Sequence, residues 1–126
     1  MARQLCCLIT ILVLLKMTFN CDEHTLTVVS YNMHGYNQGF TTVRDLSSSI
    51  EPDIFLLQEH WLTSDNLSKF DHFCDDYFMF GTSAMNSCVE TGILRGRPFG
   101  GVVTLIKNTL RNCISTVHSA ERHVKI

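Results

Sequence analysis

Short runs of apolar residues, each ended by polar residues, glycine or proline, form the main pattern of this sequence. The run at 26–31 is rich in β-branched and aromatic side chains, which predicts a strand. Ile54 to Leu57 follow Pro52 and precede polar residues, and four apolar residues in succession are typical of a strand buried on both faces. Further strands are expected at 77–81, 100–107 and 113–118, with a hairpin turn at 108–109 between the last two.

Between the first two strands, the spacing of apolar residues predicts a short helix. Its apolar stripe has members three and four positions apart, at Val43, Leu46 and Ile50. Thr41 or Thr42 can cap its start, and the glycines between 32 and 39 predict a loop before it. A second short helix is expected between 65 and 73, and a surface loop at 82–98.

The segment from 26 to 57 therefore reads as strand, loop, helix and strand. A crossover helix of this kind favours two parallel strands whose carboxyl ends lie at the same edge of the sheet. Asn32 ends the first strand and Glu59 follows the second, so the two polar side chains are expected to converge. A carboxylate on a rigid strand end suits a hard cation such as Mg²⁺, which prefers oxygen ligands. The alternative is that Glu59 only begins a solvated loop.

Length and composition limit the class of protein. A chain of 126 residues is long enough for one domain and too short for two comfortable ones. With 45% hydrophobic and 17% charged residues, neither a disordered chain nor a polytopic membrane protein is expected. The net charge of −2 and the lack of a basic cluster do not by themselves indicate a nucleic-acid-binding protein. A metal site could still attract a phosphate.

The N-terminus carries an apolar run, Leu5 to Leu15, that is ended by Lys16. The run has the length of a signal-peptide core and is shorter than the ~20 residues that span a bilayer. Residues 1–20 are therefore interpreted as an apolar leader, either a signal peptide or anchor, or a leader without a targeting role. The residues after it lack the small-x-small pattern of a cleavage site. Secretory or membrane entry would follow only if the run acts as a signal.

The six cysteines include no C-x-x-C pair and no histidine spacing of the zinc type, so a structural zinc site is not expected. In an oxidising compartment the four cysteines after the leader could pair, and Asn66 lies in an Asn-Leu-Ser glycosylation sequon. These four are Cys21, Cys74, Cys88 and Cys113.

Three short motifs, in this order, resemble the endonuclease/exonuclease/phosphatase superfamily: Ser30-Tyr31-Asn32, Leu57-Gln58-Glu59 and Gly100-Gly101-Val102. Two longer stretches are most similar to the endonuclease domain of LINE-type, non-LTR retrotransposons. They run from Gln58 to Leu62 and from Val103 to Asn108. The resemblance covers the chain from residue 26 to its last residue.

The resemblance implies an α/β fold, a two-layer αβ sandwich of the DNase I-like type, over residues 25–126. It also implies phosphodiester hydrolysis with Mg²⁺ or Mn²⁺ as cofactor, DNA as the substrate class, and an intracellular or nuclear location. By the resemblance, Glu59 is a metal ligand and Asn32 a second catalytic residue that helps to place the metal or the phosphate. Such chemistry needs a cation to neutralise charge on phosphate oxygens and to orient a water.

The chain also departs from the superfamily pattern. The later Gly-Asp-x-Asn and Ser-Asp-His motifs are absent, and neither His118 nor His123 follows an aspartate as required. His34 stands where many members carry an acidic residue, and we interpret it as a loop residue. The chain is therefore expected to be the N-terminal half of the domain, weakly active or inactive. Its exposed sheet would need the missing half or a second copy as partner.

Other functions compete with this interpretation. The chain could be a non-enzymatic remnant, or a small secreted binding protein held by disulfides. Within the superfamily, a sphingolipid or an inositol phosphate is the alternative substrate. Trp61 is interpreted as a packing residue and not as a platform for stacking bases. No feature indicates a strong membrane partner.

Overall fold

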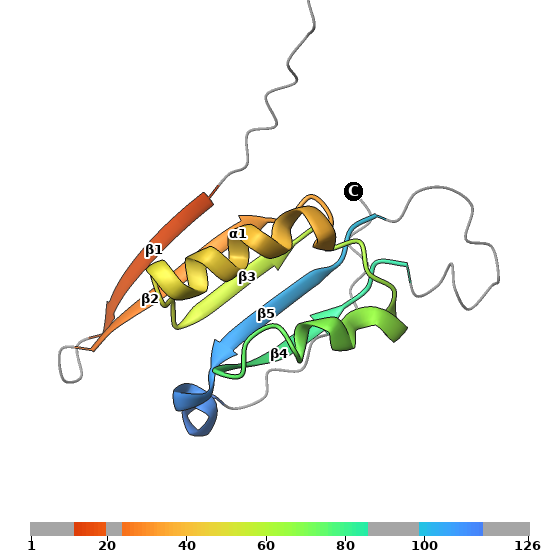
Figure 1. The fold of residues 1–126 in the computed structure, drawn as a ribbon. Helices are drawn as coiled ribbons and strands as arrows, with labels where there is room; N and C mark the ends of the chain where they lie inside the picture. The colour runs from red at the N-terminus through yellow and green to blue at the C-terminus, as the bar shows by residue number, and fades with distance from the viewer. Residues whose placement is uncertain (1–11, 20–23, 86–98, 115–126) are drawn as a thin grey trace, which may run out of the picture.

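The computed structural model describes residues 12–19, 24–85 and 99–114. The elements in these ranges are β1 (Leu12–Phe19), β2 (His24–Asn32), α1 (Tyr36–Ser49), β3 (Ile54–Gln58), the 3-10 helix η1 (Ser64–Phe70), β4 (Tyr77–Thr82), β5 (Val102–Lys107) and the 3-10 helix η2 (Asn108–Cys113). The strands form one sheet in the order β1-β2-β3-β5-β4 (Figure 1). None of the helices in the described ranges is long and apolar enough to span a membrane.

The sheet is mixed, and its one parallel pair among the described strands is β2 with β3. Helix α1 connects these two strands, as the spacing of apolar residues predicts. Their carboxyl ends consequently lie at the same edge of the sheet. Asn32 is the register partner of Gln58, and the amide of Met33 donates to the carbonyl oxygen of Gln58 at 2.8 Å.

Strand β1 extends the sheet into the predicted leader. It pairs antiparallel with β2, from Leu12 opposite Tyr31 to Phe19 opposite His24. Residues 12–19 of the leader therefore contribute to the sheet, which starts before the expected domain boundary at residue 25. Residues 1–11 lie outside the described ranges, and a targeting role for the run stays a prediction.

The core lies between the sheet and the two helices, α1 and η1, that cover one of its faces (Figure 1). Val43 of α1 and Phe70 of η1 are buried there. Edge-to-face aromatic pairs reinforce this layer, with 5.1 Å between the ring centroids of Tyr36 and Phe70. The strands supply buried apolar residues to the same cluster: Val29, Phe55, Leu57, Val103 and Leu105.

None of the described helices covers the opposite face of the sheet, which is partly open, although Val28 and Ile106 on it are buried. Along β3 the exposure alternates, because Phe55 and Leu57 are buried whereas Leu56 is 37% exposed. The prediction that β3 is buried on both faces is therefore wrong, since the described helices cover one face alone. Phe80 and Val102, which are 48% and 54% exposed, lie on the same open face.

Helix α1 begins at Tyr36, several residues before the expected cap at 41–42. Gly35 is the N-cap residue, with φ of 96°, and no side chain caps the helix. Gly39 was expected in a loop but lies in the first turn, where a Cβ would stand 2.6 Å from Cβ of Met33. The glycine thus allows the helix to pack closely on the end of β2, and the expected loop is correspondingly shorter.

The remaining elements agree with the predictions except near the C-terminus. Helix η1, β4 and β5 confirm the helix and the two strands expected there. The hairpin turn expected at 108–109 is wrong, because Asn108 begins η2. Its amide and its side chain donate to the carbonyl oxygens of Asp76 and Asp75, at 2.8 and 2.7 Å. Most of the strand expected at 113–118, and most of the loop expected at 82–98, lie outside the described ranges.

Candidate functional site

The segment 59–61, which follows β3, is held by backbone hydrogen bonds on two sides. Toward α1, its carbonyl oxygens accept from the amides of Gly35 and Tyr36 at 2.8 and 2.9 Å. Toward β5, its amides donate to the carbonyl oxygens of Gly100 and Gly101 at 3.0 and 2.9 Å. These contacts fix the backbone of the segment between the start of a helix and the start of a strand.

Three residues at this edge have positive φ although none is a glycine. The φ angles are 51° at His34 and 57° at both Glu59 and Trp61. Each such residue costs roughly 1–3 kcal/mol, and the conformation persists where the surrounding structure over-determines it. Backbone strain of this kind is concentrated at functional sites. The edge formed by the ends of β2 and β3 is therefore the candidate site.

The carboxylate of Glu59 is held through one of its two oxygens. Oε2 accepts hydrogen bonds from Nε1 of Trp61 at 2.9 Å and from the amide of Gly100 at 3.2 Å. Hydrogen bonds to an ionised carboxylate are stronger than neutral ones, so this orientation is well defined. Within the described ranges no donor is bonded to Oε1. The partly exposed side chain thus offers one oxygen to a ligand.

Asn32 is the last residue of the neighbouring strand β2, where its register partner is Gln58, the residue before Glu59. Its Oδ1 accepts from the amide of His34 at 2.9 Å, a local turn that holds the loop before α1. The oxygen retains a second lone pair. The structure therefore brings Asn32 and Glu59 to one edge, as expected from the sequence, while their chemical roles stay predictions. His34 lies in the loop, as expected.

His60 is a buried residue of this edge that the sequence argument did not single out. Its Nδ1 accepts from the amide of Leu62 at 2.9 Å, and its Nε2 lies 3.0 Å from the carbonyl oxygen of Thr82. The two contacts place the proton on Nε2. Burial lowers the pKa of His60, although the Thr82 carbonyl and the charge of Glu59 act in the opposite direction. A Cβ at Gly101 would overlap the imidazole, which explains the glycine.

Trp61 is half-buried and packs as expected, but it also contacts the site. A Cβ at Gly35 would stand 2.7 Å from Cε3 of the indole, so the absence of a side chain at position 35 leaves room for the ring. The ring of His34 lies 5.0 Å from that of Trp61, centroid to centroid. The position of Trp61 next to a buried strand predicts that the ring packs. The sequence does not predict its hydrogen bond to Glu59, because that bond depends on the left-handed backbone conformation of the segment.

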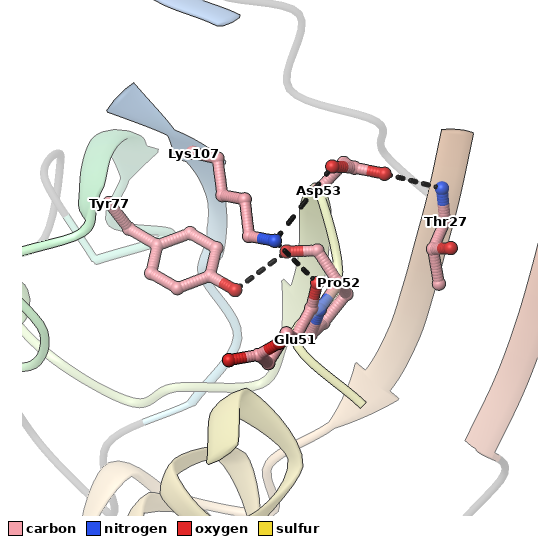
Figure 2. Close-up of polar contacts among 6 residues, drawn as sticks. All are labelled: Thr27, Glu51, Pro52, Asp53, Tyr77 and Lys107. Atoms are coloured by element: carbon pink, nitrogen blue, oxygen red, sulfur yellow. Dashed lines mark hydrogen bonds and ion pairs between the residues drawn. The ribbon is translucent and has the colours of Figure 1, made fainter. Parts of the chain in front are cut away.

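The opposite end of β3 carries a second group of charged residues, shown in Figure 2. Asp53 Oδ2 accepts from the amide of Thr27 at 2.7 Å, and its Oδ1 lies 4.0 Å from Nζ of Lys107. The same Nζ donates to the carbonyl oxygen of Glu51 at 2.7 Å. These contacts pair the Asp53 carboxylate with a cation of the chain and connect the start of β3 to β2 and to the end of β5.

The donor set at Glu59 fits Mg²⁺ better than a soft metal. Within the described ranges, no group of three or more His, Cys, Asp or Glu side chains is arranged to hold a metal ion. Mg²⁺ commonly binds through one or two carboxylates and keeps several waters, so it does not need such a group. One oriented carboxylate with an unengaged oxygen, at the sheet edge where Asn32 also ends its strand, meets that requirement.

The arrangement of strands and helices is an α/β fold of the DNase I-like type, which confirms the fold class expected from the sequence. The AP endonuclease LMAP from Leishmania major has a similar structure, with a TM-score of 0.51 and 18% identity over 80% of this chain and 30% of that one. The 3'-5' exonuclease NExo from Neisseria meningitidis is also similar, with a TM-score of 0.46 and 18% identity over 63% and 26%. No protein-family model and no curated protein sequence matches the chain.

At this level of identity the comparison with LMAP shows the fold alone. The chain spans about 30% of the length of that protein. The comparison therefore assigns no activity or substrate to this chain.

Proposed function

We propose that this chain carries the cation-binding part of a Mg²⁺-dependent phosphodiester hydrolase, with DNA as its substrate class. The observation that carries the proposal is the carboxylate of Glu59, which is fixed through Oε2 at the end of a strand. The DNase I-like fold supports it. The resemblance to LINE-type retrotransposon endonucleases supports the choice of DNA over a sphingolipid or an inositol phosphate.

Each residue has a defined part in this proposal. Glu59 would hold Mg²⁺ or Mn²⁺ through Oε1. When bound, the cation neutralises charge on phosphate oxygens and lowers the pKa of a bound water. Asn32, whose Oδ1 is bonded to the amide of His34, would donate from its side-chain amide to a phosphate oxygen. The buried His60 stays on the other side of the segment and serves to hold it.

The absence of the Gly-Asp-x-Asn and Ser-Asp-His motifs favours a second candidate, a non-enzymatic remnant of the same fold. Without those motifs the chain lacks the aspartate that would orient the attacking water and the histidine that would stabilise the phosphate. We therefore expect slow turnover. The secreted, disulfide-held alternative gains no support, because Cys74 and Cys113 are free thiols and Cys21 and Cys88 lie outside the described ranges.

The test is the nicking of supercoiled plasmid by the purified chain, in Mg²⁺ and in EDTA, next to Glu59→Gln. The glutamine keeps an oxygen for the N–H donors of Trp61 and Gly100 but removes the charge. We expect slow Mg²⁺-dependent nicking that falls at least about a hundredfold in the variant, in the range found when a group acting on developing charge is removed.

Two results would count against this function. Equal nicking by the wild type and by Glu59→Gln would contradict the role of Glu59. If neither protein nicks the plasmid above the EDTA control, the result would contradict the hydrolase and support the non-enzymatic remnant.

A further inference from the structure

The indole of Trp61 makes the two oxygens of Glu59 unequal. Its Nε1–H donates to Oε2 at 2.9 Å, and the amide of Gly100 donates to the same oxygen at 3.2 Å. A carboxylate oxygen with two donors is less available to a cation than one with none. The arrangement therefore leaves Oε1 as the oxygen that can bind.

The indole is itself held in place from several directions. Gly35 lies against one part of the ring, where even a Cβ would come within 2.7 Å of Cε3. The imidazole of His34 lies 5.0 Å away, centroid to centroid. The amide of Trp61 donates to the carbonyl oxygen of Gly100 at 3.0 Å. A donor fixed in this way can hold a flexible glutamate side chain in one orientation.

The strained backbone supports the same conclusion. Glu59 and Trp61 both have φ of 57°, with His60 between them. Solvation alone would not require a partly exposed glutamate and a half-buried tryptophan, two residues apart, both to adopt left-handed backbone conformations. The indole–carboxylate hydrogen bond is a contact that depends on both.

We propose that Trp61 is a positioning residue that presents Oε1 of Glu59 to a divalent cation. This inference rests on the proposed function, since it needs a cation at Glu59. Residues that hydrogen-bond to a metal ligand restrict its rotamers and raise affinity before the metal arrives. The role differs from packing, because packing needs the ring and positioning needs its N–H.

The variant that separates the two roles is Trp61→Phe, which keeps an aromatic ring and removes the donor. We expect the Kd for Mn²⁺, measured by calorimetry and checked by competition with Mg²⁺, to rise about tenfold, at the lower end of the range for such residues. The melting temperature, followed by circular dichroism, should stay close to that of the wild type.

Tyr77→Phe is the matched control, because it also removes one donor from an aromatic residue. The Tyr77 hydroxyl donates to the carbonyl oxygen of Pro52 at 2.6 Å, at the opposite end of β3 (Figure 2). Its loss leaves a buried acceptor without a partner. We expect this variant to melt at a lower temperature and to bind Mn²⁺ as the wild type does.

A second readout needs no variant at position 61. Trp61 is the single tryptophan of the chain, so its indole N–H gives one assignable signal in a ¹H–¹⁵N spectrum. That signal should shift when Mg²⁺ is added to the wild type. In Glu59→Gln it should be displaced before any metal is added, because its charged acceptor has gone.

The outcomes separate this inference from the proposed function. If Glu59→Gln loses Mn²⁺ affinity while Trp61→Phe keeps the wild-type Kd, the inference fails and the cation site stands. The inference also fails if the chemical shift of the indole N–H changes neither on addition of Mg²⁺ nor in Glu59→Gln. If the wild type binds no Mn²⁺, or Glu59→Gln binds it unchanged, both the inference and the proposed cation site fail.

Discussion

The edge at the ends of β2 and β3 concentrates strain, charge and hydrogen bonding on neighbouring residues. Glu59 combines a left-handed backbone with a carboxylate that accepts two hydrogen bonds through one oxygen. His60, directly after it, is wholly buried and uses both ring nitrogens within the fold. Glu59 thus keeps one oxygen without a described donor, whereas His60 anchors the segment within the fold.

The pH dependence of stability follows from His60. Its lowered pKa means that the folded protein binds the proton less readily than the unfolded chain, whose histidine titrates near 6.5. Protonation of Nδ1 would also break the hydrogen bond from the amide of Leu62. The contribution of neutral His60 is therefore complete above pH 6.5 and is lost as the pH falls toward the lowered value.

We expect the urea midpoint of the wild type to drop between pH 7.5 and pH 5. His60→Asn should be less stable at pH 7.5 and should show a smaller drop. The exposed residue His72 gives the control, since His72→Asn should keep the full drop of the wild type. Identical pH dependence in His60→Asn and in the wild type would show that another group is responsible.

At the scale of elements, the strands after the leader up to β5 could be predicted, whereas the start of α1 could not. The strands at 26–31 and 54–57 follow from local apolar runs, and so does the parallel pairing through a crossover helix. The start of α1 at Tyr36 depends on a packing contact between Gly39 and Met33, which no local pattern reveals. The exposure of one face of β3 likewise depends on what covers the sheet.

The apolar run near the N-terminus shows the same limit of local patterns. It has the length of a targeting segment, yet its second part pairs with β2 as strand β1. An apolar run is compatible with either use, and its pairing with the next strand shows one of them without testing a targeting role. The turn expected at 108–109 failed for a similar reason, because Asn108 is held by the carbonyl oxygens that precede β4.

The candidate site was predictable in part. Asn32 and Glu59 could be placed together because the carboxyl ends of parallel strands share an edge. The contacts of His60 and Trp61 involve Thr82 and Gly100, which are distant in sequence, so they could not be inferred. Gly101 permits the close approach of the His60 imidazole, but its place in the sequence does not reveal which group approaches.

At the scale of the molecule, the described residues present a partly open, apolar sheet face, with Leu56, Phe80 and Val102 exposed on it. Residues at alternate positions of β2 to β5 occupy it, and none of them is charged. Leu56 and Phe80 flank Thr104 in register, so exposed apolar side chains lie in neighbouring strands. Such a face favours association, since burying one large apolar side chain contributes about 1.5–3 kcal/mol.

We expect the chain to self-associate with rising concentration, as measured by analytical ultracentrifugation. Leu56→Lys should weaken this association at least about tenfold, because a charge on the face would have to be desolvated. Ile50→Lys is the matched control, since Ile50 is also 37% exposed but lies at the end of α1. An equal effect of the two variants would contradict the assignment of association to the sheet face.

The most direct test of the cation site is to ask which end of β3 binds Mn²⁺. Asp53 and Glu59 lie on opposite ends of this strand, about 20 Å apart at roughly 3.3 Å per residue, so paramagnetic broadening in a ¹H–¹⁵N spectrum separates them. We predict that substoichiometric Mn²⁺ first broadens the signals of Glu59, the Gly100 amide and the Trp61 indole. Broadening that begins at Glu51, Asp53 and Lys107 instead would contradict the account.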